Sequence, residues 1–134
     1  MSLKPMNPAA FAVILAGGLG TRLWPLSRKH KTKPFLKITG DESLLGVTCK
    51  RLRGVIPPRR TLVVTAAEAT GMVAENLPRI PKNNILAEPN GRNTAASIGF
   101  AAIHARSRNP KAVLAVFPAD HYIADLGKFK QLLH

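Results

Sequence analysis

Apolar residues along this chain cluster in four short runs, each bounded by glycine, proline or polar residues. Runs of this kind are typical of strands buried on both faces, because neither side of such a strand has to meet water. We therefore predict strands at residues 11–16, 61–65, 84–87 and 112–117.

The stretches between these runs carry apolar positions at helical spacing. Thr65 opens one of them with capping-box spacing, and Asn93 and Asp125 are suitable N-caps for two others. We predict helices at residues 44–55, 65–77 and 94–108, and a short final helix after Asp125. In the longest helix, the residues expected to face the sheet are Ala95, Ile98, Ala102 and Ile103.

Strands thus alternate with helices along the chain, which favours right-handed crossovers between parallel strands. The predicted fold class is α/β, with a doubly wound, mostly parallel sheet. Ligands of such sheets bind beyond the carboxyl ends of the strands. The segments that follow the first, third and fourth predicted strands are therefore expected to converge on one site.

The segment after the first predicted strand combines glycines with basic residues. Gly17, Gly18 and Gly20 have no Cβ, so the backbone can bend sharply and a ligand can come close to it. Successive backbone N–H groups in such a loop can form a concave anion site. Arg22 can bind phosphate oxygens with its planar guanidinium, and Lys33 adds a point charge. The pattern predicts a loop that holds a polyphosphate.

Two other glycine motifs do not fit this segment. The dinucleotide fingerprint needs a third glycine three residues after the second, but Gly20 is followed by Thr21, Arg22 and Leu23. The Walker loop needs a Gly-Lys-Ser/Thr tripeptide, which the sequence lacks. An ordinary glycine-rich turn is the remaining alternative, although such a turn does not require the basic residues.

Three segments resemble known motifs. Residues 15–27 resemble the signature of sugar-1-phosphate nucleotidylyltransferases, Leu-Ala-Gly-Gly-x-Gly-Thr-Arg-Leu-x-Pro-Leu-Ser/Thr, and Thr32 stands where the family's later Pro-Lys pair has proline. Residues 88–96 resemble the Glu-Pro-x-Gly-Arg-Asn-Thr-Ala-Pro segment of mannose-1-phosphate guanylyltransferases, with Ala96 replacing the last proline. Residues 117–123 resemble the Pro-Ala-Asp-His segment of the same family.

This resemblance implies a Rossmann-like fold and a nucleotidyl transfer that uses Mg²⁺, with GTP and mannose 1-phosphate as partners and GDP-mannose and pyrophosphate as products. The chain is shorter than the family's catalytic domain, so it is expected to supply an incomplete, N-terminal nucleotide-binding half at residues 11–134. Residues 1–10 are expected to form a tail whose first residues derive from an expression vector. The chain alone is expected to be weakly active or inactive.

The resemblance also implies residue roles. Arg22 and Lys33 would be catalytic, the first holding the pyrophosphate oxygens and the second stabilising charge near the α-phosphate. Asp120 would hold Mg²⁺, which takes a few carboxylate oxygens together with phosphate and water; a helix-capping role is the alternative. His121 would either bond a phosphate or orient the loop. The expected nucleotide-binding residues are Leu15, Ala16, Gly17, Gly18, Gly20, Thr21, Glu88, Pro89, Gly91, Arg92, Asn93 and Thr94, the last two with helix capping as the alternative or additional role.

The net charge of +13 has three explanations: a solvated basic surface, a field that attracts an anionic substrate, or nucleic-acid binding. Twelve of the twenty Lys and Arg residues lie within residues 1–60. A nucleic-acid surface is typically interleaved with aromatic residues for stacking, and the basic run at residues 28–33 contains none. We therefore expect no specific nucleic-acid partner.

The remaining features favour a cytoplasmic protein. Cys49 is the single cysteine, so no internal disulfide can form. We expect no membrane partner, because no apolar run is long enough to cross a bilayer. An exposed edge of the predicted sheet would favour a homo-oligomer. Two functional alternatives stay open: a nucleotidylyltransferase for another nucleoside triphosphate or sugar phosphate, and a non-catalytic nucleotide-binding fragment.

Overall fold

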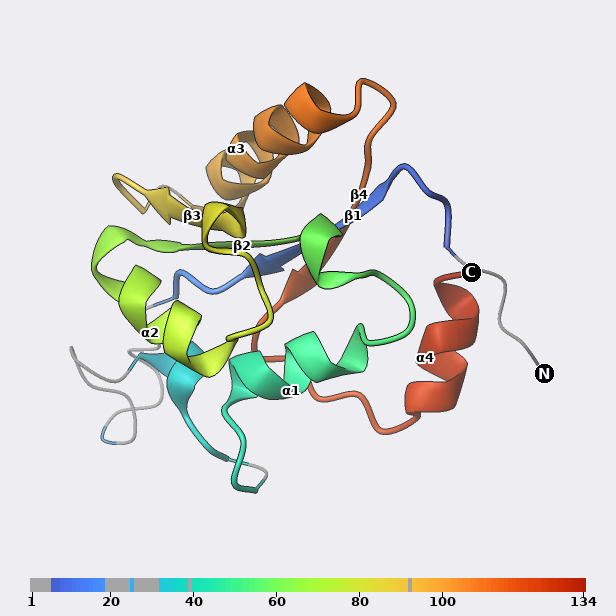
Figure 1. Ribbon diagram of the computed structural model, residues 1–134. Helices are drawn as coiled ribbons and strands as arrows, with labels where there is room; N and C mark the ends of the chain where they lie inside the picture. Colours follow the sequence, from blue (N-terminus) through green and yellow to red (C-terminus); the bar gives the residue numbers. More distant parts are fainter. Residues whose placement is uncertain (1–5, 19–24, 26–31, 39, 92) are drawn as a thin grey trace.

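The computed structural model describes residues 6–18, 25, 32–38, 40–91 and 93–134 (Figure 1). They contain a four-stranded sheet in which every pair of neighbouring strands is parallel, in the order β3-β2-β1-β4. The strands are β1 (Ala10–Leu15), β2 (Thr61–Ala66), β3 (Ile85–Glu88) and β4 (Val113–Pro118). The predicted parallel α/β sheet is confirmed, and each strand boundary lies within one residue of its predicted position.

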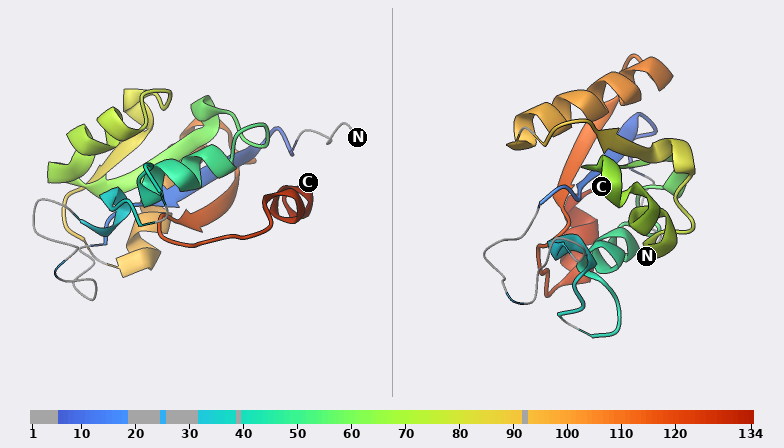
Figure 2. Two further views of the ribbon diagram at one scale, coloured as in Figure 1. Left: turned by 90° about the horizontal axis from the view of Figure 1, so that it is seen from below. Right: turned by 90° about the vertical axis from the view of Figure 1, so that its left-hand side faces the viewer.

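Helices cover both faces of the sheet. The helices are α1 (Leu44–Arg51), α2 (Thr70–Asn76), α3 (Asn93–Arg108) and α4 (Leu126–Leu132). In Figures 1 and 2, α1 and α2 lie on one face and α3 on the other. The chain runs outward from β1 to β3 on the first face and returns through α3 to β4, on the other side of β1. This reversal makes the sheet doubly wound, as predicted.

Each face of the sheet has its own hydrophobic core, because successive side chains of a strand point to opposite faces. Ile14 packs with Leu45 and Val73 beneath α1 and α2. The neighbouring residue, Val13, packs with Ala101 beneath α3. Burial of each large aliphatic side chain stabilises the folded state by about 1.5–3 kcal/mol, so packing on both faces holds β1 in place.

The helix predicted at residues 65–77 begins later than its capping-box spacing indicated. Thr65 belongs to β2, and its hydroxyl donates to the carbonyl oxygen of Ala16 at 3.1 Å. A short 3₁₀ helix, Ala67–Ala69, precedes α2. The predicted cap at Thr65 is therefore wrong, because the neighbouring strand takes the hydroxyl that a cap would have used.

The helix predicted at residues 44–55 is real but ends at Arg51. Its N-cap is Ser43, whose hydroxyl oxygen accepts from the Gly46 backbone N–H at 3.0 Å. Beyond the helix, Gly54 has φ of +82°, a conformation that a residue with a Cβ rarely adopts. The glycine therefore favours the turn that takes the chain away from the helix axis.

The longest helix was predicted with the wrong face toward the sheet. Its buried residues are Ser97 and Ala101, followed by Ala105, whereas Ile103 is 71% exposed. Small side chains four residues apart let α3 lie close to the sheet. The packing gained by this close approach outweighs the burial that Ile103 would have gained on the same face. Asn93 is the first residue of α3, with φ of +66°, which asparagine tolerates better than most residues.

Candidate functional site

The carboxyl ends of β1 and β4 form the reversal point of the sheet. Leu15 pairs with Pro118 in the parallel register, and the Ala119 N–H donates to the Leu15 carbonyl oxygen at 3.1 Å. The connection after β1 leads toward β2, whereas the chain after β4 continues on the other side of β1. Such reversal points are where doubly wound sheets bind ligands. The segments starting at Gly17 and Asp120 therefore leave the sheet side by side.

Lys33 and Asp120 meet at this edge. The Lys33 Nζ forms an ion pair with the Asp120 Oδ2, and their side chains are 34% and 27% exposed, respectively. Lys33 starts a short 3₁₀ helix, Lys33–Phe35, in which the buried Pro34 and Phe35 anchor the segment in the core. Lys33 and Asp120, which are far apart in the sequence, thus form a half-buried ion pair near the segment that starts at Gly17.

The Asp120 carboxyl is held in its charged form. Partial burial by itself raises the pKa of Asp120, but the hydrogen bond and the charge of Lys33 together outweigh it, so the pKa lies below its ordinary value of 3.8. The carboxylate is therefore ionised at neutral pH. It presents hard oxygen donors of the kind that Mg²⁺ prefers, so the residue at this position fits a magnesium ligand.

Helix α1 positions the loop that carries Asp120. The Thr48 hydroxyl donates to the Ala119 carbonyl oxygen at 3.0 Å, and an Arg51 guanidinium N–H donates to the His121 carbonyl oxygen at 2.9 Å. The backbone is therefore tied immediately before and after Asp120. Both anchoring residues are buried. Neither was identified from the sequence, because a Thr and an Arg in a helix carry no signal that they bond a loop some seventy positions away.

Arg51 is an unusual residue to bury at this place. Its guanidinium carbon lies 5.7 Å from the centre of the Phe129 ring, on α4. Burial lowers the pKa of Arg51 from its ordinary value, yet the group stays charged at neutral pH. Its Nε has no hydrogen-bond partner among the described residues. Arg51 thus contacts both the loop after β4 and α4 from its place at the end of α1.

Glu88 connects the second motif to the first. It ends β3, and its Oε1 accepts from the Ser97 hydroxyl at 2.7 Å. Its Oε2 lies 3.7 Å from the point that a Cβ on Gly17 would occupy. Gly17 and Gly18 are both exposed. A carboxylate from β3 and the glycine segment after β1 therefore face the same space at the carboxyl edge of the sheet.

The other predicted nucleotide-binding residues divide into three groups: residues packed in the core, exposed residues, and residues outside the described part of the chain. Ala16 and Leu15 form the first group. Ala16 is buried, and its backbone N–H donates to the Val64 carbonyl oxygen at 2.8 Å, so its main chain bonds the sheet, and Leu15 packs against the core beneath α3. The exposed group consists of Pro89, Gly91, Asn93 and Thr94. The predicted residues that lie outside the described part of the chain are Gly20, Thr21, Arg22 and Arg92.

Within the described residues, no group of three or more His, Cys, Asp or Glu side chains is arranged to hold a metal. Asp120 is thus the single carboxylate that the sequence and the geometry both favour as a ligand. A Mg²⁺ ion held by one carboxylate must take its other oxygens from phosphate and water. His121 lies next to Asp120 with an exposed side chain.

Comparison with known proteins gives a consistent result. Residues 11–134 match the family model described as nucleotidyl transferase. The chain is 48% identical over 122 residues to mannose-1-phosphate guanylyltransferase 2 of Escherichia coli O157:H7, covering 88% of this chain and 25% of that protein. It is 43% identical over 125 residues to the alginate biosynthesis protein AlgA of Pseudomonas aeruginosa, covering 90% and 25%, respectively.

Solved structures show the same likeness. The crystal structure of mannose-1-phosphate geranyltransferase from Thermus thermophilus superposes with a TM-score of 0.80 at 36% identity, covering 93% of this chain and 36% of that one. This chain spans about a quarter of the length of the curated relatives that it matches. None of the helices in the described ranges is long and apolar enough to cross a membrane.

Proposed function

We propose, from the premise that this chain belongs to the nucleotidyl transferase family, that it supplies the nucleotide- and metal-binding half of an enzyme transferring GMP from GTP to mannose 1-phosphate. The observation that carries the proposal is the Lys33–Asp120 ion pair beside the exposed glycine segment at the reversal point of the sheet. Relatives at 48% and 41% identity are mannose-1-phosphate guanylyltransferases, which supports the choice of substrates. The proposed half comprises residues 11–134.

The reaction is an in-line displacement at phosphorus. A phosphate oxygen of mannose 1-phosphate forms a bond to the α-phosphorus of GTP, while the bond from that phosphorus to the bridging β-phosphate oxygen breaks. Pyrophosphate leaves with the electron pair of the broken bond. Such a step needs positioning and charge neutralisation more than covalent help from the protein. When bound, Mg²⁺ supplies part of that neutralisation.

The residues at the carboxyl edge suit these tasks. Asp120 would hold the metal, and Lys33 would stabilise the negative charge that develops around the α-phosphate. Because the Lys33 Nζ is paired with the Asp120 Oδ2, the ammonium and a metal ion would compete for the same carboxylate oxygen. The ion pair thus holds Lys33 beside the place where the α-phosphate would bind.

The glycine segment would wrap the triphosphate. Backbone N–H groups of Gly17, Gly18 and Gly20 would donate to phosphate oxygens, with the Thr21 side chain beside them and Arg22 on the pyrophosphate. Leu15 and Ala16 would set the direction in which this segment leaves β1. The nucleoside would contact the segment from Glu88 to Thr94, which includes Pro89, Gly91, Arg92 and Asn93.

We place the enzyme in the cytoplasm, where nucleoside triphosphates and sugar phosphates are available, and expect no specific nucleic-acid partner. A homo-oligomer is the proposed assembly. Its proposed basis is the half-exposed strand β4, which among the described residues has a neighbouring strand on one side only and could pair with a second copy on the other.

Isothermal titration of the 134-residue chain with GTP, ATP, UTP and dTTP, each with MgCl₂, tests the proposal. We expect GTP to bind at least about tenfold more tightly than the other three, because specific edge contacts to a base contribute more than about 1.4 kcal/mol. Equal binding of ATP or dTTP would contradict the guanine assignment. In a product assay with mannose 1-phosphate, the chain alone is expected to form little or no GDP-mannose.

The proposed role of Asp120 as a Mg²⁺ ligand can be tested with a matched control variant. Asp120→Asn keeps the size of the side chain but removes its charge, and should weaken binding of GTP–Mg²⁺ at least about tenfold. Asp125→Asn makes the same chemical change at the N-cap of α4, where asparagine also caps, so it should leave that affinity unchanged. If both variants bind GTP–Mg²⁺ as the parent chain does, Asp120 is not a ligand.

A further inference from the structure

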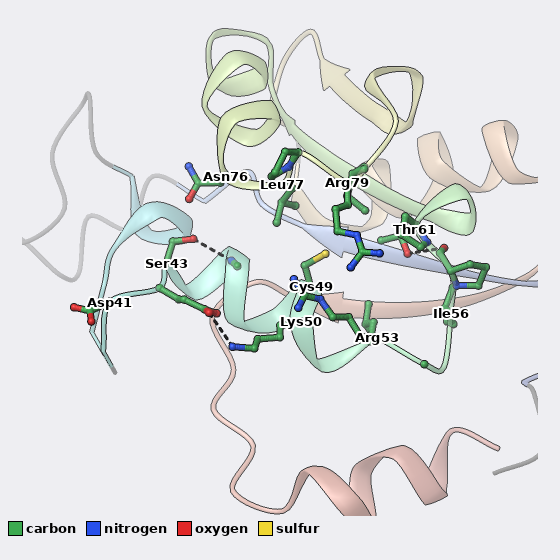
Figure 3. Close-up of a pocket in the computed structure, with 18 of the residues that line it drawn as sticks. Asp41, Ser43, Cys49, Lys50, Arg53, Ile56, Thr61, Asn76, Leu77 and Arg79 are labelled. Atoms are coloured by element: carbon green, nitrogen blue, oxygen red, sulfur yellow. Dashed lines mark hydrogen bonds and ion pairs between the residues drawn. The ribbon is translucent and has the colours of Figure 1, made fainter. Parts of the chain in front are cut away.

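A second hollow lies away from the nucleotide site, in the groove between α1 and α2 (Figure 3). Its volume is about 640 Å³, within the range of pockets that hold small organic molecules. Neither Gly17 nor Lys33 nor Asp120 lines it. Its apolar wall is formed by Leu52, Ile56, Pro57, Leu77 and Ile80.

The charged residues of this hollow are mainly basic. Four cationic side chains line it against two carboxylates. One of those carboxylates, Glu42, is already bound to Lys50 at 2.8 Å. Arg53 and Arg79 form no ion pair with any described residue. The pKa of the Glu42 carboxyl is lowered mainly by Lys50 and further by the charge of Arg53, so Arg53 interacts with this carboxylate at longer range, whereas Arg79 has no ion-pair partner among the described residues.

The two arginines line this hollow from different segments. Arg53 lies two residues beyond the end of α1, whereas Arg79 follows α2, and Figure 3 shows the Arg79 side chain directed into the hollow toward Cys49. Both arginines act electrostatically on the Cys49 thiol. Their charges therefore add to the positive potential around the same thiol, which favours an anion in this cavity.

Cys49 does not supply that anion. Burial raises the pKa of its thiol, and this outweighs the opposing effect of Arg53 and Arg79, so the pKa stays above its ordinary value of 9.0. At neutral pH the sulfur is therefore a neutral, polarisable part of the floor. The lining therefore keeps an excess of positive charge that a ligand can use.

We propose that this hollow binds a small organic anion, a molecule whose phosphate, sulfonate or carboxylate group lies between Arg53 and Arg79 and whose apolar body covers Leu52, Leu77 and Ile80. The planar guanidinium fork matches such oxyanions in two-point contacts. Both arginines are exposed, so the apolar body of the bound molecule would itself have to shield these contacts from water, which would strengthen them. This site is distinct from the nucleotide site and does not depend on the proposed reaction.

The test uses 8-anilinonaphthalene-1-sulfonate as the probe on the 134-residue chain, with N-phenyl-1-naphthylamine as the same apolar body without the sulfonate. We expect the sulfonate probe to bind at least about tenfold more tightly than the neutral one, and to weaken as ionic strength rises from about 0.05 M to about 0.5 M. The amide resonances expected to shift are those of Cys49, Arg53, Leu77 and Arg79.

Paired variants give the decisive comparison. Arg53→Gln with Arg79→Gln should weaken sulfonate binding at least about tenfold. Arg106→Gln with Lys111→Gln removes the same charge from exposed positions at the far end of α3 and should change it less than about twofold. Equal binding to both double variants, equal binding of the two probes, or shifts confined to residues outside the hollow would each overturn the proposal.

Discussion

At the scale of single residues, the Lys33–Asp120 pair has two consequences that work in opposite directions. It keeps the carboxylate ionised, and it occupies the oxygen that a metal would use. Exposed or half-exposed ion pairs contribute less than about 1 kcal/mol to folding, so the pair is poorly explained as a device for stability. Its position at the reversal point of the sheet fits a site that exchanges partners instead.

Lys33→Gln should separate these two effects. Without the ammonium, burial still raises the pKa of Asp120 and only the backbone hydrogen bond and His121 still lower it, so that pKa should rise from its value in the parent chain. The parent chain should be more stable than the variant at pH 7, and this advantage should disappear as pH falls through the lowered pKa of Asp120. Carbon-detected NMR titration of the carboxyl, with urea unfolding at each pH, measures both quantities.

The control is Lys37→Gln, which removes an exposed lysine from the same segment and should leave the pKa of Asp120 unchanged. If Lys33→Gln also leaves that pKa unchanged, the ion pair does not exist in solution. Titration with Mn²⁺ in the absence of nucleotide adds a second readout, since removal of the competing ammonium should increase the affinity of Asp120 for the metal.

At the scale of elements, α1 is the part of the fold that connects packing with chemistry. One of its faces lines the hollow through Gly46 and Cys49, and another ties down the loop around Asp120 through Thr48 and Arg51. The apolar spacing of the helix predicted its existence. The long-range bonds could not be predicted, because they depend on where β4 ends relative to α1.

The same contrast explains which other elements were predictable. The strands were located to within one residue because burial on both faces leaves an uninterrupted apolar run. The face of α3 that packs on the sheet was predicted wrongly, because small residues such as Ser97 and Ala101 decide how closely the helix approaches the sheet. Thr65 was misassigned because its hydroxyl bonds a neighbouring strand that only the fold brings near.

Thr48→Val tests the positioning role of α1. Valine has a similar shape but no hydroxyl, so the Ala119 carbonyl oxygen loses its donor at a buried position. We expect a loss of about 1–3 kcal/mol in the free energy of unfolding and a weaker affinity of the folded chain for Mn²⁺–GTP. Urea unfolding and titration of the folded variant give the two values.

Thr48→Ser is the matched control, because it keeps the donor while removing a methyl group. It should retain the metal–nucleotide affinity even though it loses some stability. A valine variant that binds Mn²⁺–GTP as tightly as the serine variant would show that the hydroxyl supports the fold without positioning Asp120.

At the scale of the whole molecule, the two edges of the sheet have different tasks. The carboxyl edge carries exposed glycines and the half-exposed Lys33–Asp120 ion pair. The amino edge is tied by the buried Asn84, whose amide donates to the carbonyl oxygens of Pro58, Arg59 and Thr61 at 2.9–3.1 Å. The Asn84 contacts thus support the fold at a distance from the candidate site.

Asn84 joins both faces of the molecule at this edge. Its Oδ1 accepts from the Arg108 guanidinium at 2.6 Å, at the end of α3, while its amide holds the chain that enters β2. The sequence predicted it as the first residue of a strand, but it ends the short 3₁₀ helix Lys82–Asn84 before β3. A buried asparagine with all these partners is a fold-determining residue that no local pattern reveals.

Asn84→Ala should therefore produce the opposite result to Asp120→Asn. Three backbone carbonyls, one of them in a buried hydrogen bond, and an arginine lose their partner, so the free energy of unfolding should fall by about 2–4 kcal/mol, whereas Asn83→Ala, at an exposed neighbour, should cost less than about 0.5 kcal/mol. The fraction of Asn84→Ala that stays folded should bind Mn²⁺–GTP normally, because the altered contacts lie at the other edge of the sheet. Loss of that affinity in the folded variant would contradict the division of tasks between the two edges.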